Sequence, residues 1–181
     1  MPVGRDLTQT CVSSETIYQG KMLRVRRDMV QLTPDGPAFE RVVVSHPGAV
    51  VVVPLTAAGE VLLVRQYRYA AAEALLECVA GTLEPGEAPA ECAAREIQEE
   101  AGVRAGRLTP LAEFYSAPGF SSEKLYLFLA EELSESRLPG DADEEIDVER
   151  MPLAEAVAMA QRGELHDAKT IVGLCLAAAR R

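Results

Sequence analysis

Four glutamates and one arginine recur at a spacing that could hold a metal ion. They lie between Gly81 and Val103, at Glu87, Arg95, Glu96, Glu99 and Glu100. On a helix, Glu96, Glu99 and Glu100 fall within an arc of about 100°, and alanines and an isoleucine fill the adjacent arc. Glutamates four positions apart repel each other unless a cation neutralises them, and Mg²⁺ prefers such oxygen ligands. The triplet alone is also typical of a solvated acidic face, so the whole spacing has to decide between the two.

The whole spacing resembles the Nudix box. That motif reads Gly, five residues, Glu, seven residues, Arg-Glu, an aliphatic residue, any residue, Glu-Glu, any residue, Gly and an aliphatic residue, and every fixed position is met here. The resemblance implies a Mg²⁺-dependent hydrolase of a nucleoside diphosphate linked to another group, with Mn²⁺ as a substitute metal. The metal ligands that it implies are the backbone carbonyl of Ala80 and the carboxylates of Glu96, Glu99, Glu100 and Glu144. Arg95 lies near Glu99 on the helix and has no acceptor capacity, so we assign it to orienting that carboxylate.

Outside the box, the chain resembles the ADP-ribose pyrophosphatases over most of its length. The loop Ser116-Ala117-Pro118-Gly119-Phe120-Ser121 is similar to a proline-containing loop of that subfamily, and Pro118 follows Gly102 by 16 residues. Val64-Arg65-Gln66-Tyr67-Arg68 resembles a segment that carries a substrate-contacting arginine. The substrate-binding residues implied in this way are Arg68, Tyr18, Pro118, Gly119 and Phe120. Taken alone, Arg68 is also typical of a solvated strand end, Pro118 of a rigid turn and Tyr18 of a core position.

A second acidic cluster runs from Asp141 to Asp147 and precedes a short predicted strand. By itself, such a run is typical of a solvated loop. In the resembling family, this loop brings a glutamate over the metal site, as a ligand or as the base that activates water. Glu144 is the better match for that residue and Glu145 the second, and the catalytic residues we predict are Glu144, Glu145, Glu99 and Arg95.

The function predicted on this resemblance is hydrolysis of the diphosphate of ADP-ribose to AMP and ribose 5-phosphate. The alternatives within the enzyme class are GDP-mannose or another nucleoside diphosphate sugar, FAD, or an oxidised nucleotide as the substrate. An alternative from another class is a Nudix-like module that binds nucleotides without turnover. Such modules usually carry a degraded box or an added DNA-binding domain, whereas this chain keeps every box glutamate.

The bulk composition excludes several classes of function. The chain has 181 residues and a formal net charge of −10, which argues against nucleic-acid binding because phosphate contacts need a basic surface. The apolar run from Ala49 to Leu55 is too short to span a membrane, and the first ten residues lack the apolar core of a signal peptide. The four cysteines have no paired spacing, so we expect neither a zinc site nor disulfides, and we expect a cytoplasmic protein.

The expected fold class is α+β, a Nudix-type α/β/α sandwich with a mixed sheet plus a small N-terminal antiparallel β element. We expect residues 1–46 to form the N-terminal element and residues 47–181 the hydrolase domain. Two strands, 21–32 and 39–44, are predicted in the N-terminal element. Because two strands alone bury too little surface, and because the resembling family forms dimers that exchange this element, we expect a homodimer.

Patterning also predicts the elements of the hydrolase domain. A hairpin is expected from strands 49–54 and 61–65, and a helix is expected from about Pro89 to Ala101, with proline in its first turn and Gly102 after its end. The further strands expected are 75–79, 108–114, 125–130 and 146–149, and the further helices are 153–162 and one that starts near Lys169.

Overall fold

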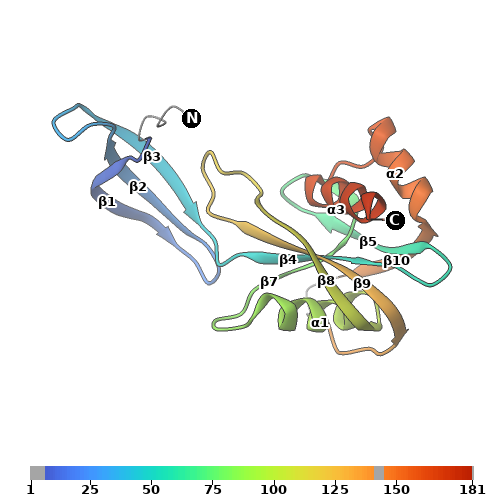
Figure 1. Ribbon diagram of the computed structural model, residues 1–181. Helices are drawn as coiled ribbons and strands as arrows, with labels where there is room; N and C mark the ends of the chain where they lie inside the picture. Colours follow the sequence, from blue (N-terminus) through green and yellow to red (C-terminus); the bar gives the residue numbers. More distant parts are fainter. Residues whose placement is uncertain (1–6, 141–144, 181) are drawn as a thin grey trace. The chain divides into compact units, whose positions relative to one another are not determined.

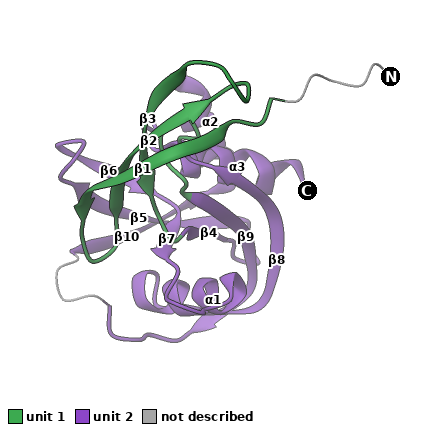
Figure 2. Cartoon of the chain, turned by 90° about the vertical axis from the view of Figure 1, so that its left-hand side faces the viewer, with its two compact units in different colours: residues 1–47, 117–123 green, residues 48–116, 124–181 purple. Residues whose placement is uncertain are grey.

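The computed structural model describes residues 7–140 and 145–180. The chain divides into two compact units, which Figure 2 colours separately. Unit 1 comprises residues 1–47 and 117–123, and unit 2 comprises residues 48–116 and 124–181.

Unit 1 is built on a three-stranded antiparallel sheet in the order β1-β2-β3. The strands are β1 (Thr10–Gln19), β2 (Arg24–Gln31) and β3 (Ala38–Ser45). A turn joins β2 to β3, and in it Gly36 N donates to Thr33 O at 3.1 Å. The predicted pair of strands is corrected to three, because β1 was missed. Every residue of β1 is exposed. Its sequence does not alternate between apolar and polar residues, which is the pattern that marks a half-buried strand.

The loop 117–123 belongs to unit 1 although it is far from the first three strands in sequence. Val44 at the end of β3 donates its backbone N–H to Phe120 O at 2.8 Å, and Ser122 N donates to Val44 O at 3.0 Å. Glu123 Oε1 lies 3.8 Å from His46 Nε2. Backbone hydrogen bonds therefore fix the conformation of the proline loop against β3.

Unit 2 contains two sheets, in the orders β7-β4-β9-β8 and β10-β5-β6. Because β4 and β9 run parallel while the other pairs are antiparallel, the larger sheet is mixed, as predicted. The strands of the larger sheet are β4 (Ala49–Pro54), β7 (Val79–Thr82), β8 (Val103–Tyr115) and β9 (Lys124–Glu135). Those of the smaller sheet are β5 (Glu60–Arg68), β6 (Glu73–Glu77) and β10 (Ile146–Pro152).

Two local predictions for unit 2 are wrong. The strands β4 and β5 do not form a hairpin, since each lies in a different sheet and only an isolated bridge between Leu55 and Val61 joins this region. The strand β4 is buried along its whole length and β5 from Val61 to Val64, and each finds its pairing partners elsewhere in the chain. The single strand predicted at 75–79 is two strands, β6 and β7, separated at Cys78.

Helices cover both faces of the larger sheet (Figure 1). Val50 and Val52 of β4 point into the core under α1 (Pro89–Glu100), together with Ile97. Val51 and Val53 point into the opposite core, which α2 (Leu153–Arg162) and α3 (Ala168–Ala179) cover. The α/β/α sandwich is thus confirmed, and it places α1 alone on one face.

None of the helices in the described ranges has the length and apolar character needed to cross a membrane. All four cysteines are free thiols; Cys78 and Cys92 are buried, and Cys11 and Cys175 are exposed.

Candidate active site

The helix α1 carries the last three of the four box glutamates and begins and ends where its sequence predicts. Pro89 occupies the first turn, and Glu91 accepts a hydrogen bond from Ala88 N at 3.1 Å, which satisfies one of the open N–H groups. Gly102, with φ +67°, follows the last turn, in the left-handed region that glycine adopts most easily. Ala93 and Ile97 are completely buried, so the packing of this face fixes the rotation of the helix about its axis.

Arg95 gathers three of the box carboxylates around one guanidinium. Its Nε and Nη2 donate to the two carboxylate oxygens of Glu87 at 3.0 and 3.1 Å. Its Nη1 donates to Glu96 Oε1 at 2.6 Å and to Glu99 Oε2 at 2.8 Å. The arginine therefore contacts Glu99 as an orienting role requires, and it also contacts two carboxylates that were not assigned to it.

The charges of this cluster shift the protonation of two neighbours. The hydrogen bonds from Arg95 lower the pKa of Glu87 to about 2, so this carboxylate is ionised at neutral pH. Burial and the nearby charge of Glu96 raise the pKa of the Cys92 thiol well above its ordinary value. Cys92 is thus a neutral thiol at neutral pH. Because the thiolate is the form that binds metal, and because Mg²⁺ prefers oxygen ligands, Cys92 does not suit a metal-ligand role.

Glu96 and Glu100 reach from α1 to the backbone of β7. A Cβ atom at Gly81 would lie 1.8 Å from the carboxylate carbon of Glu96, so Glu96 occupies the space beside this glycine. Glu100 Oε2 accepts a hydrogen bond from Ala80 N at 3.2 Å. Only 9% of Glu96 and 7% of Glu100 is exposed, which is low for residues that carry a charge.

The carboxylates do not form a closed ligand set. Among the residues that the structure describes, no group of three or more His, Cys, Asp or Glu side chains is assembled around one point. The reason is visible in the hydrogen bonds, because Arg95 draws Glu96 and Glu99 while the backbone of Ala80 holds Glu100. The arrangement supplies hard oxygen donors on adjacent helical turns, the donor type that Mg²⁺ takes.

Arg68 lies at the end of β5 and makes a two-point ion pair with Glu77. Its Nε and Nη2 donate to Glu77 Oε1 and Oε2, each at 2.7 Å. Two residues before Arg68 on β5, Gln66 is 8% exposed, and its Oε1 has no hydrogen-bond donor among the described residues. The substrate-binding role of Arg68 stays a prediction.

The other predicted substrate-binding residues lie in unit 1. The ring of Tyr18 lies against Gly20, where a Cβ atom would meet the ring carbon Cε1 at 2.9 Å. Tyr18 is 59% exposed, so it is a surface residue of the chain rather than a core residue. Phe120 is likewise 59% exposed, in the loop with Pro118 and Gly119, and Gly119 has open space beside it.

The acidic loop before β10 is only partly described. Glu144 lies outside the described residues, and its predicted place over the metal site stays a prediction. Glu145 is exposed and immediately precedes Ile146, the first residue of β10.

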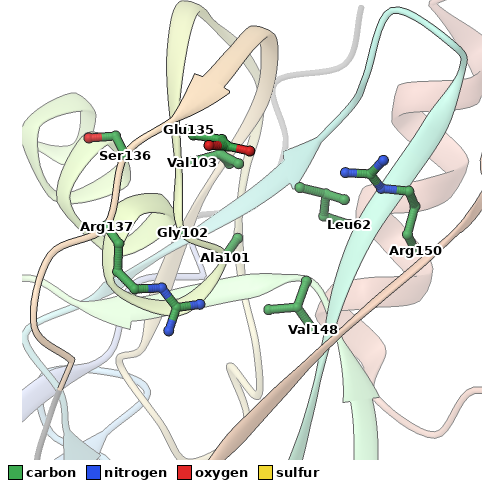
Figure 3. Close-up of a pocket in the computed structure, with 9 residues that line it drawn as sticks. All are labelled: Leu62, Ala101, Gly102, Val103, Glu135, Ser136, Arg137, Val148 and Arg150. Carbon is green, nitrogen blue, oxygen red and sulfur yellow. The ribbon is translucent and has the colours of Figure 1, made fainter.

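A cavity of about 670 Å³ opens near the C-terminal end of α1 (Figure 3). Its walls include Gly102 and Val103 of the box, and the side chains of Arg137 and Arg150 flank it from opposite sides. The guanidinium of Arg137 lies over Gly102, since a Cβ atom there would meet Arg137 Nε at 3.1 Å. None of the predicted site residues lines this cavity.

Sequence reasoning missed three residues that this geometry brings forward. Glu87 was read as a fixed box position, and the structure makes it the two-point partner of Arg95. Glu77 and Lys169 were not assigned, although both belong to one charged group with Arg68. The available signal was a glutamate at the end of an apolar strand, because a buried carboxylate requires a cationic partner.

Comparison with known proteins agrees with the box. A family model of the NUDIX domain matches residues 45–172. The chain is 39% identical over 168 residues to an ADP-ribose pyrophosphatase of Bacillus subtilis (strain 168), covering 92% of this chain and 90% of that protein. It is 39% identical over 166 residues to an ADP-ribose pyrophosphatase of Mycobacterium tuberculosis (strain ATCC 25618 / H37Rv), covering 90% and 80%. A crystal structure of an ADP compounds hydrolase superposes with a TM-score of 0.82 at 26% identity, covering 98% of this chain and 96% of that one.

Proposed function

The chain belongs to the Nudix family, and on this premise we propose that it hydrolyses the diphosphate of ADP-ribose to AMP and ribose 5-phosphate. The observation that carries the proposal is the seating of Glu96 and Glu100 against the backbone of Gly81 and Ala80. The box in this chain thus forms a local structure and is more than a pattern of letters. Two relatives named ADP-ribose pyrophosphatase match nearly the whole chain, which favours ADP-ribose over other nucleoside diphosphates.

Hydrolysis of a diphosphate needs positive charge, because the phosphate oxygens repel an attacking water. The residues that would hold Mg²⁺, or Mn²⁺ in its place, are Glu96, Glu99 and Glu100, with the carbonyl of Ala80 and with Glu144 from the acidic loop. The space beside Gly81 fits this assignment, because only a residue without a side chain leaves room for the Glu96 carboxylate there. Bound metal would neutralise the phosphate oxygens and lower the pKa of a coordinated water.

The protein's own side chains have separate tasks in this proposal. Arg95 orients Glu96 and Glu99 through its Nη1 and anchors itself on Glu87. Glu144, or Glu145 next to it, takes the proton from the attacking water as the P–O bond to the leaving phosphate breaks. Arg68 binds the diphosphate through its planar guanidinium.

Exposed aromatic residues of unit 1 are available for the adenine. Tyr18 and Phe120 each present an exposed ring, and a flat aromatic face suits stacking on a purine. Pro118 and Gly119 shape the loop that carries Phe120. We therefore keep Tyr18 and this loop as the proposed base-binding residues.

We also propose that the protein is a homodimer in which residues 1–46 form the dimerisation element. The support is the exposure of apolar side chains on a sheet of only three strands. A small sheet that exposes several apolar side chains has surface available to a partner. The exposed apolar side chains on this sheet are Val12, Ile17, Tyr18, Phe39 and Val42.

Product analysis tests the proposed function. Purified protein with Mg²⁺ would be incubated separately with ADP-ribose, GDP-mannose, FAD and 8-oxo nucleotides, and the products separated by chromatography. We expect ADP-ribose to be consumed with the highest kcat/KM and to give AMP and ribose 5-phosphate in equal amounts. We expect no turnover in EDTA. A higher kcat/KM for another compound would reassign the substrate, and no turnover of any of them would favour a binding module.

A further inference from the structure

Glu77 is a completely buried carboxylate at the end of β6. Its side chain is 1% exposed, and it accepts hydrogen bonds from two cations, Arg68 of β5 and Lys169 of α3. Burial raises the pKa of this carboxyl group, but the hydrogen bonds and charges of Arg68 and Lys169 outweigh burial and lower it. Glu77 is therefore ionised at neutral pH, with two cationic partners for one carboxylate.

The two cations differ in how far they reach toward solvent. The side chain of Arg68 is 37% exposed, whereas that of Lys169 is 17% exposed. The contact between Arg68 and Glu77 uses both Nε and Nη2, which fixes the plane of the guanidinium as well as its position. Arg68 is thus the outward member of the group, and its guanidinium is held at two points by Glu77.

The other side of the group is tied to the start of α3. Asp167 accepts hydrogen bonds from Thr170 N at 2.9 Å and from Lys169 Nζ at 3.0 Å. Thr170, which is completely buried, accepts at Oγ1 a hydrogen bond of 2.7 Å from Cys78 N. Lys169 therefore contacts Glu77, and Thr170 binds the backbone of Cys78, the next residue of the chain.

A buried charged group of this kind is a costly way to stabilise a fold. Replacing a buried ion pair by well-packed apolar residues is often neutral or stabilising. The replacement removes the attraction between the charges, but it also removes the free-energy penalty of desolvating them. Its specific property is orientation: a guanidinium that is already held loses little side-chain entropy when it binds a ligand. An outward-facing arginine held in this way suits recognition of an anion with a fixed geometry.

We propose that Glu77, supported by Lys169, is a positioning residue that orients Arg68 for the diphosphate of the substrate. This inference rests on the proposed function in one respect, namely that Arg68 contacts the diphosphate. Glu77 itself touches no substrate, and its effect passes through Arg68.

Steady-state kinetics of single and double variants test the proposal. Glu77→Gln keeps the shape of the side chain and removes its charge, and we expect it to raise KM about tenfold with kcat within about twofold of the wild type. Glu77→Asp keeps the charge and shortens the side chain, so it serves as the second variant in case Glu77→Gln does not fold. We expect it to raise KM as well. Lys169→Met should raise KM less, and Lys169→Arg should restore the wild-type value.

The double-variant cycle separates positioning from a general structural role. In an Arg68→Ala background, Glu77→Gln should have no further effect on KM, because the residue through which it acts is absent. The matched control is Glu149→Gln, which breaks a second pair on β5, with Arg65 at 2.5 Å, and should leave KM unchanged. A wild-type KM in the folded Glu77 variants, or a Glu77 effect that persists without Arg68, would overturn the proposal.

Binding of ADP by calorimetry keeps this test independent of turnover. We expect Glu77→Gln and Glu77→Asp to weaken ADP binding about tenfold and Glu149→Gln to leave it unchanged. If the wild type binds ADP in this Glu77-dependent way but does not cleave ADP-ribose, the proposed function fails and the positioning role stands. If ADP-ribose is cleaved and neither KM nor ADP affinity depends on Glu77, the positioning role fails and the proposed function stands.

Discussion

The carboxylate of Glu96 lies where a side chain of Gly81 would have to be. A Cβ atom at Gly81 would come within 1.8 Å of both the carboxylate carbon and Oε1 of Glu96, far inside van der Waals contact. The first glycine of the box and the glutamate that follows its arginine are therefore linked sterically, although 15 positions separate them in the printed sequence. The glycine is required so that the carboxylate can lie against β7.

This contact predicts a severe effect of Gly81→Ala. Either the Glu96 side chain leaves its place or the helix moves away from β7, and overpacking of this kind costs about 1–3 kcal/mol of stability. We expect kcat/KM for ADP-ribose to fall by about 10²-fold or more, because a small misplacement of a catalytic group has an effect of this size. Gly140→Ala is the control, since its Cβ would make only an ordinary contact at 3.8 Å. Wild-type activity in folded Gly81→Ala would contradict the assignment of Glu96.

The acidic loop supplies the second prediction. If Glu144 is the base, Glu144→Gln should lower kcat by about 10²–10⁴-fold with little change in KM, as expected for a general acid–base contribution. Glu145→Gln should have a much smaller effect. Reversed effects would show that the register of the loop is shifted by one residue. If neither variant changes kcat, the base lies within the box.

The buried Glu77 predicts a dependence of stability on pH. The pKa of Glu77 is lowered in the folded protein from an ordinary value of 4.5. Its ionised form therefore contributes fully to the stability of the fold above pH 4.5, and this contribution is lost as the pH falls through the folded pKa. At neutral pH, Glu77→Gln should lower the free energy of unfolding by about 3–5 kcal/mol relative to the wild type, because Arg68 and Lys169 lose their shared partner. Urea unfolding at several pH values should show this gap narrowing below about pH 4.5. A gap independent of pH would contradict an ionised, charge-paired Glu77.

The exposed sheet of unit 1 predicts the assembly state. Light scattering of the wild type should give the mass of a dimer at micromolar concentration. Ile17→Lys and Val42→Lys should shift it toward the monomer, because each places a charge among exposed apolar side chains of the sheet. Leu176→Lys on α3 is the control, since Leu176 is exposed on the other unit. A fully active wild-type monomer would contradict the proposed dimer.

Local sequence signals predicted much of the fold. Proline and glycine mark the two ends of α1, and the apolar arc of the helix predicts its buried face, so its bounds agree with the structure within one residue. The pairing of strands was less accessible. The strand β4 and the first half of β5 are buried on both faces and carry no alternation that would identify partners, so adjacency in sequence wrongly suggested a hairpin. β1 is exposed along its whole length, and it has no buried apolar face by which the sequence could identify it as a strand.

The same distinction holds for the site. The contact of Arg95 with Glu99 follows from a spacing of four residues on one helix and was predictable. The contacts of Glu77 with Lys169 and of Cys78 with Thr170 each join residues 92 positions apart, and no local period encodes them. They arise because α3 packs over β4 beside the end of β6, which only the assembled fold reveals.

The most direct test of the account is the turnover of ADP-ribose by Glu100→Gln at saturating Mg²⁺. Glutamine keeps an oxygen that can accept the hydrogen bond from Ala80 N, so the fold should remain and the thermal stability without metal should be unchanged or slightly higher. The loss of one carboxylate charge from the proposed metal site should remove most of the activity. Activity close to that of the wild type would contradict the central claim that the α1 carboxylates hold the metal.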